Sequence, residues 1–151
     1  MTTDLDPHWH QEFSRRLDLE ARCRPYAAHT WRVGSDRPTL HLDDVSDIPF
    51  LVDIAGVDEY QHRARLRCGD GDLFATVTAP PPGYEPYCRE WLGLGAPAHV
   101  RSLPGRNRLA VTDGCRQREP FSRLVSIARA AGGLNIHPYM GIDAVWILAA
   151  E

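Results

Sequence analysis

Residues 73–78 read LFATVT and are followed by APPPG at positions 79–83. The β-branched and aromatic side chains of the first stretch favour a strand, and three consecutive prolines cannot continue its ladder of hydrogen bonds. Apolar side chains then recur at spacings of three and four over residues 84–92, which predicts a helix that ends at Gly93 or Gly95. The chain therefore passes from a strand through a tight loop into a helix.

The same alternation continues toward the C-terminus. We expect strands over 99–103, 109–112 and 134–137, a helix over 119–131, and a closing helix over 142–150. This rhythm is typical of an α/β protein whose mostly parallel sheet is covered on both faces. The sequence thus predicts a Rossmann-like open sheet of about four to five strands, with helices on both faces.

The N-terminal part of the chain is less regular. Helices are predicted over 7–22, from Ser46 to Gly56 and over 58–67, and short extended segments over 30–33 and 39–42. We therefore assign residues 1–45 to a helix and connectors that pack on the core, and residues 46–151 to the α/β core. A length of 151 residues suits one domain overall.

All 17 basic residues are arginine, so the chain contains no lysine. Chemistry that needs a lysine, such as a Schiff base or a P-loop contact with ATP phosphates, cannot be supplied by this chain. With 20 acidic residues the formal charge is -3, and this mildly acidic balance disfavours a nucleic-acid partner.

Four cysteines stand at positions 23, 68, 88 and 115, and none forms a CxxC pair. The spacing excludes a zinc knuckle and a thioredoxin-like redox motif. The acidic N-terminus lacks the features of a signal peptide, and no apolar run approaches the roughly 18 residues of a membrane span. We therefore expect reduced thiols, a cytoplasmic protein and no membrane partner.

Familiar metal-binding and catalytic motifs are missing from the sequence. His8 and His10 are two residues apart, so a helix would point them to different sides. The acidic residues at 43–44 and 70–72 lack the spacing of a calcium loop and are explained by a helix cap and a turn. No GxSxG occurs, and no GxGxxG follows a strand. We expect no metal and no cofactor in this chain, and the sequence assigns no catalytic residue.

Candidate binding residues are expected beside the carboxyl ends of the strands, where open α/β sheets bind their ligands. Thr76 and Thr78 share one face where their strand ends. Asp113 follows the strand predicted over 109–112, and His137 and Tyr139 close the last strand. Together these groups can hydrogen-bond a small polar ligand, although turn chemistry with a capping aspartate explains the same residues.

Several short segments follow one another in a recognisable order. Residues 48–63 read IPFLVDIAGVDEYQHR, 77–80 read VTAP, Tyr84 and Tyr87 precede LGL at 92–94, and LAVTD at 109–113 precedes IHPYMG at 136–141. This order resembles the pre-ATP-grasp domain of certain ATP-grasp peptide ligases over about residues 46–150. Two departures are Ala79, where the family tends to have serine, and the segment 67–72, which is shorter and more polar than expected.

The resemblance implies a non-catalytic domain that walls the cleft of an ATP-dependent carboxylate–amine ligase and helps to hold the acceptor for peptide bond formation. It adds Tyr84 to the candidates that face this cleft. The chain stops where the nucleotide-binding and metal-binding subdomains of that family begin. ATP and Mg²⁺ are therefore expected only in an adjoining ATP-grasp core, in cis or in trans, and whether this chain counts as an enzyme stays open.

Two other functions remain open. A freestanding domain could bind or convert a small molecule at the same edge, with Asp113 and His137 as acid and base. An interaction module could use the final helix, whose apolar residues extend around more than one face. A homodimer is a further assembly that the sequence allows, and the sequence does not identify the substrate or product.

Overall fold

The computed structural model describes residues 15, 36–51, 53–105 and 107–151. The helix predicted over 7–22 falls outside these residues except for Arg15, and so does the extended segment predicted over 30–33. Residues 36–151 form one compact unit, which contains a four-stranded sheet.

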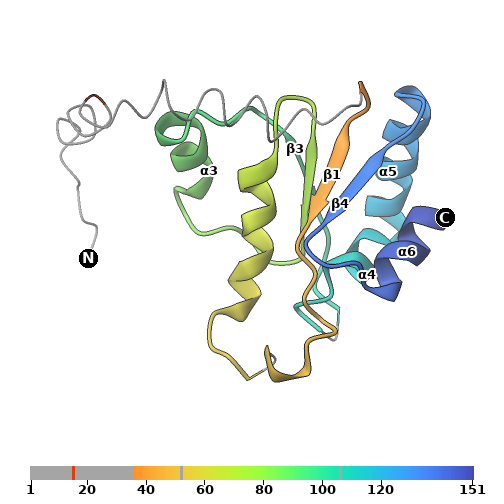
Figure 1. The fold of residues 1–151 in the computed structure, drawn as a ribbon, viewed down its shortest axis with the longest axis horizontal. Coiled ribbons are helices and arrows are strands. Elements are labelled where there is room, and N and C mark those ends of the chain that lie inside the picture. Colours follow the sequence, from red (N-terminus) through yellow and green to blue (C-terminus); the bar gives the residue numbers. More distant parts are fainter. Residues whose placement is uncertain (1–14, 16–35, 52, 106) are drawn as a thin grey trace. The chain divides into compact units, whose positions relative to one another are not determined.

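The sheet is parallel throughout, and its strand order is β3-β2-β1-β4 (Figure 1). Its strands are β1 (Thr39–Leu42), β2 (Leu73–Thr76), β3 (Ala98–Arg101) and β4 (Asn135–Pro138). This confirms the predicted open α/β fold. Because β1 lies between β2 and β4, the sheet begins before residue 46, where the sequence places the start of the α/β core. The chain reverses its direction of travel across the sheet between β1 and β4, which makes this position the topological switch point.

Short helical elements connect the strands. They are η1 (Pro49–Leu51), η2 (Val57–Arg67), α3 (Tyr84–Pro86), η3 (Tyr87–Trp91), α4 (Val111–Cys115), α5 (Arg118–Ala130) and α6 (Asp143–Ala150). η1 and η2 are 3₁₀ helices, and η3 continues α3 as a π-helical turn. Figure 1 shows α3 on one side of the sheet and α4, α5 and α6 on the other.

Alternate residues of the same strands build two different faces. The apolar face is formed by Leu40, Leu42, Leu73, Ala75 and Val100, which pack in one core with side chains of α4, α5 and α6. The polar face is formed by the residues between them: His41 and Asp43, Phe74 and Thr76, His99, and His137. Burying a Leu or Val side chain stabilises the fold by roughly 1.5–3 kcal/mol, so the apolar face supplies most of the packing energy.

Arg65 links the helical segments that cover the polar face of the sheet. Its side chain is fully buried and makes two hydrogen bonds to Glu85, at 2.7 and 2.9 Å, and a third to the Gly95 carbonyl at 2.8 Å. A Cβ on Gly95 would lie 2.6 Å from the Asp70 backbone nitrogen, so only glycine permits this approach. These contacts join η2 to α3 and to the loop before β3.

The strand predicted over 109–112 is wrong, because Val111 begins the helix α4. A run of only four apolar residues cannot distinguish a strand from a buried helical turn. In the structure Val111 and Cys115, four residues apart, both enter the apolar core, and this spacing belongs to a helix. Asp113 consequently lies on α4 and not at the end of a strand.

The helix predicted from Ser46 to Gly56 is also shorter than expected, because only Pro49–Leu51 is helical among its described residues. The remainder is a series of turns, and Gly56 adopts the left-handed φ of 77° that favours glycine. β2 ends at Thr76 and not at Thr78. The reason is that the Val77 and Thr78 N–H groups donate to Gln61 Oε1, at 2.6 and 3.1 Å, and not to a neighbouring strand.

Candidate functional site

The crevice at the switch point receives side chains from three elements. Asp43 follows β1, Tyr139 follows β4, and Arg63 and Arg67 reach toward them from η2. η2 packs over β1 and β2, and the side chains of His137 and Tyr139 on β4 and its exit remain exposed. We call Asp43, Arg63, Arg67, His137 and Tyr139 the arginine cluster.

Asp43 organises this cluster from within. Its side chain is 0% exposed, and Oδ2 lies 3.3 Å from Arg63 Nε and 3.3 Å from Arg67 Nη1. Arg67 Nη2 also donates to Asp43 Oδ1, so the Arg67 fork is bidentate. A buried carboxylate persists only when it is paired in this way, and here one carboxylate orients two guanidinium groups.

Arg63 contacts two tyrosine rings. Its Cζ lies 4.4 Å from the ring centroid of Tyr60 and 4.6 Å from that of Tyr139. Each ring attracts the cation through its quadrupole, which contributes about 0.5–1 kcal/mol at an exposed site. Tyr139 is itself positioned by its backbone N–H, which donates to the Leu42 carbonyl at 2.9 Å. The guanidinium is therefore fixed before any ligand arrives.

Two histidines stand beside the arginines on neighbouring strands. The rings of His41 and His137 are 5.1 Å apart, and His41 Nε2 lies 3.6 Å from Asp72 Oδ2. Burial lowers the pKa of His41 to about 4 despite the Asp72 carboxylate, which favours the charged form. Partial burial and the charge of Arg67 lower the pKa of His137. Both rings are uncharged at neutral pH.

The predicted residues Thr76, Thr78 and Tyr84 meet in a second cluster with His62 and His99. Thr76 Oγ1 donates to the Thr78 carbonyl and also contacts His99 Nε2, both at 2.8 Å. Thr78 Oγ1 lies 3.2 Å from His62 Nε2, and Tyr84 Oη donates to the His62 carbonyl at 2.8 Å. These polar groups bond one another, so this cluster ties η2 and α3 to β2.

The pKa values of this second cluster are shifted by burial. Desolvation lowers the pKa of His99 to about 4, where Arg101 acts in the same direction, and it also lowers the pKa of His62. Burial raises the pKa of the Tyr84 hydroxyl. All three groups are therefore neutral near pH 7, which suits hydrogen bonding within the fold.

Asp44 joins the end of β1 to α4. Its Oδ2 accepts a hydrogen bond from the Thr112 N–H at 2.7 Å, and its Oδ1 accepts from the N–H and hydroxyl of Ser46 at 2.9 and 2.6 Å. The contact with Ser46 is a local turn and not the helix cap that the sequence suggests for residues 43–44, because the next helical element begins only at Pro49. Asp44 thus stabilises the crevice wall, whereas Asp43 holds the arginines.

Asp113 lies apart from the other predicted residues. It is exposed on α4, whose Val111 and Cys115 pack on the apolar face, and it lines a shallow pocket with Arg116, Phe121 and Glu151. His137 belongs to the polar face and contacts His41. The two residues lie on opposite faces of the sheet, so the structure does not assemble them as an acid–base pair.

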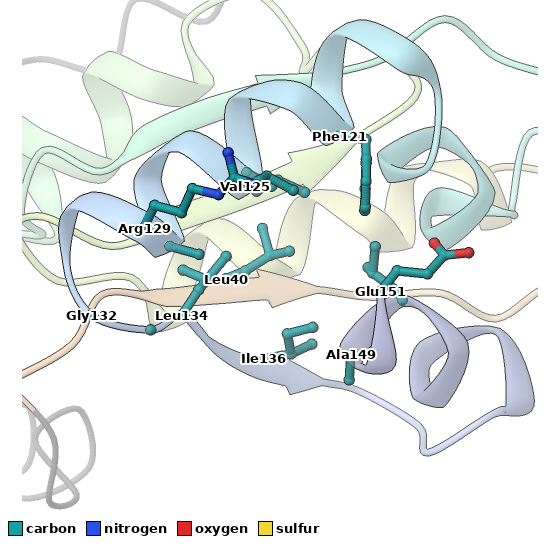
Figure 2. A pocket seen from close by; sticks show the side chains of 13 residues that line it. Leu40, Phe121, Val125, Arg129, Gly132, Leu134, Ile136, Ala149 and Glu151 are labelled. Carbon is teal, nitrogen blue, oxygen red and sulfur yellow. The ribbon is translucent and has the colours of Figure 1, made fainter.

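A groove on the apolar side opens between α5, β4 and α6. Figure 2 shows Leu40, Leu134 and Ile136 along its floor, with Arg129 at one end and Glu151 at the other. Its volume is about 500 Å³, and its lining is mostly aliphatic. Such a lining suits an apolar surface and offers little to a polar substrate.

The described ranges contain no group of three or more His, Cys, Asp or Glu side chains placed to hold a metal ion. In the same ranges, no helix has the length and apolar character needed to cross a membrane. The chain matches no known protein-family model, no curated protein and no solved structure. The candidate site therefore rests on its own geometry.

Sequence reasoning finds His137 and Tyr139 but not Arg63, Arg67, Asp43 or His41 as parts of one site. A signal exists for each pair. On an α-helix, as expected from the sequence over 58–67, Arg63 and Arg67 four residues apart would share a face, and so do His41 and Asp43, two apart on a strand. A charged or polar pair on the buried face of a central strand is the unusual feature that indicates a site.

Proposed function

We propose that residues 36–151 form a non-catalytic substrate-binding domain of an ATP-dependent carboxylate–amine ligase system, of the pre-ATP-grasp type. One observation carries the proposal. At the switch point of a parallel sheet, a buried carboxylate holds two arginines and a tyrosine-lined surface in place beside the carboxyl ends of β1 and β4. This is where open α/β sheets bind ligands. The resemblance over residues 46–150 supports the assignment to a ligase.

The groups in the crevice suit binding better than chemistry. Arginine stays protonated at all accessible pH values, so Arg63 and Arg67 cannot take up a proton from a substrate. His41 has a pKa of about 4 and is buried against Asp72, which leaves it a poor acid at neutral pH. The side chains of this crevice can therefore hold and orient a substrate whose reaction occurs on another domain.

The partner in this proposal is an ATP-grasp core, in cis or in trans, which supplies ATP, Mg²⁺ and the phosphate chemistry. The absence of lysine from the chain agrees with this division of labour. We also propose a cytoplasmic location, in line with the three described cysteines, Cys68, Cys88 and Cys115, which are free and buried.

Calorimetry tests the proposal. Titration of Mg-ATP into the whole chain should give no binding with a micromolar Kd. In a screen of amino acids and short peptides, at least one compound should raise the melting temperature of the chain. Tyr139→Ala should remove that increase, and Leu103→Ala, at an exposed position on the far strand's exit, should not. Micromolar binding of Mg-ATP, or its hydrolysis by this chain alone, would contradict the non-catalytic assignment.

A second candidate function is self-association through α6. Trp146 and Ile147 are exposed on this helix, whose Leu148 and Ala149 line the groove of Figure 2, and Glu151 at one end of the groove is paired with Arg116. A symmetric contact between the α6 helices of two copies would bury these apolar side chains, as in an isologous dimer. Light scattering after size-exclusion chromatography should then give twice the chain mass. A monomeric mass at two protein concentrations that differ 100-fold would contradict this function.

A further inference from the structure

We propose that the arginine cluster binds one oxyanion, a carboxylate or phosphate group of the ligand, between Arg63, Arg67 and His137. This inference rests on the proposed function, because it names the chemical group by which the substrate is held. It concerns the crevice side of the cluster, where these three side chains lie around the β4 exit and Tyr139 flanks them.

Charge is the first reason. Asp43 neutralises only one of the two guanidinium charges, and its side chain is 0% exposed, while the side chains of Arg63 and Arg67 are 38% and 21% exposed. Solvent therefore meets the cations and not the carboxylate. The carboxylate of Asp72 is turned to His41 and to the N–H groups of Thr39 and Gly69.

The pKa values of His41 and His137 are affected by this positive charge. Burial is the main cause that lowers the pKa of His41 and of His137, and the positive charge of Arg67 acts in the same direction, whereas the carboxylates of Asp72 and Asp43 oppose it at His41 and His137 respectively. An anion bound among these residues would be attracted by the positive charge of Arg67. It would also reduce the repulsion between that charge and a protonated histidine.

Unused hydrogen-bond donors are the second reason. Arg63 Nε donates to the Tyr60 carbonyl at 3.2 Å and lies against Asp43, but Nη2 is buried without a hydrogen-bond partner among the described residues. Arg67 donates to Asp43 through Nη1 and Nη2, and its Nε has no described partner. A buried donor without an acceptor destabilises the fold, and a ligand oxygen that accepted a hydrogen bond from these groups would recover part of that loss.

Rigidity is the third reason. An arginine side chain normally loses rotamer entropy when it captures a ligand. Arg63 has already lost much of this freedom, because its guanidinium contacts the rings of both Tyr60 and Tyr139 and its Nε lies against Asp43. A guanidinium fork that is held in place binds a planar carboxylate or a phosphate with little further ordering.

Titration of the whole chain with small anions tests this site. The probes are sodium phosphate and sodium malonate, each compared with sodium chloride at equal ionic strength, and the readout is the arginine Nε–Hε signals in ¹H–¹⁵N spectra. We expect saturable shifts of the Arg63 and Arg67 signals with a Kd on the order of 1 mM. The probe that binds more tightly assigns the source of the oxyanion, phosphate or carboxylate.

Variants separate this site from general attraction to arginine. Arg67→Gln should weaken binding at least about tenfold, and Arg118→Gln, a matched change of an exposed arginine on α5, should leave it unchanged. His137→Ala alters an exposed side chain that does not pair with the buried Asp43, so this variant should fold even if Arg67→Gln does not. It should weaken anion binding about threefold. No saturable shift, or equal loss in Arg118→Gln, overturns the inference.

The two proposals can fail separately. Saturable phosphate or malonate binding together with micromolar Mg-ATP binding that survives His137→Ala would leave the oxyanion site standing and contradict the non-catalytic role. Absence of binding by both small anions, with no Mg-ATP binding, would overturn the oxyanion site and leave the assignment as a non-catalytic domain intact.

Discussion

The two faces of the sheet use the same four strands in opposite ways. On the apolar face, Leu40, Leu42 and Val100 pack against helices in one core. On the polar face, His41 and Asp43 alternate with those leucines and meet arginines and histidines. Neighbouring residues along β1 and its exit therefore play different roles. The leucines stabilise the fold because burial removes them from water, whereas the buried polar residues between them are tolerated only because they are paired. Stability and binding chemistry are thus assigned to different sides of one strand.

The largest expected effect lies on the apolar face. Leu42→Ala removes a fully buried side chain and should lower the free energy of unfolding by about 3 kcal/mol, because it loses transfer energy and leaves a cavity. Urea denaturation measures the change. Leu103→Ala, at a mostly exposed leucine, should change it by less than about 0.5 kcal/mol, and similar losses in both variants would contradict the assignment of the core.

Removal of the central carboxylate of the polar face should cost less. Asp43→Asn leaves Arg63 and Arg67 without their shared anion and should destabilise the fold by roughly 2–3 kcal/mol. The two arginines remain partly solvated, which keeps the loss below that of a fully buried pair. Asp113→Asn, at an exposed carboxylate, is the matched control and should be near neutral in urea denaturation. A neutral Asp43→Asn would show that Asp43 does not organise the cluster.

The polar face should also make stability depend on pH. His41 and His99 have pKa values of about 4 in the fold, against about 6.5 in the unfolded chain, so the unfolded chain binds more protons between these values. Stability should therefore be complete above about pH 6.5 and should fall progressively toward pH 4, because both histidines are held neutral in the fold and are protonated more readily in the unfolded chain. Around His41, Asp72 opposes this shift, and His137 and Arg67 reinforce it.

His41→Gln separates the His41 contribution from that of the acidic residues. We expect this variant to lose the His41 share of the change between pH 6.5 and 4 in urea denaturation curves, while the contributions of the other histidines with lowered pKa values and the loss below pH 4 remain. An unchanged slope would show that His41 is not held neutral by burial. Leu103→Ala, which alters no titrating group, should retain the full pH dependence.

The apolar face was much easier to anticipate from the sequence than the polar one. β-Branched and apolar residues locate β2, because burial between helices affects residue type directly, whereas residues 39–42 are predicted only as a short extended segment outside the α/β core. Residues 109–112 are also mostly apolar or β-branched, yet four residues are too few to distinguish a strand from a helical turn. Here the helical turn is stabilised by Asp44, which accepts a hydrogen bond from the Thr112 N–H. Periodicity identifies elements of the fold better than it identifies short segments whose form depends on distant contacts.

The candidate site follows the same division. His137 and Tyr139 are predictable because parallel strands bring their carboxyl ends to one edge. Arg63 and Arg67 are not, since arginines on a helix usually belong to a solvated face. Their role appears only when Asp43, 20 and 24 positions earlier in the chain, is placed beside them, and this pairing depends on the packing of η2 over β1.

The most direct test of the binding role of the polar face is a map of backbone amide shifts during a malonate titration of the whole chain. We expect saturable shifts at residues 41–44, 60–67 and 137–140, around the crevice between β1 and β4, and little change at residues 124–129 on α5. Shifts centred on α5 and α6, along the groove of Figure 2, or no saturable shift at any residue, would contradict it.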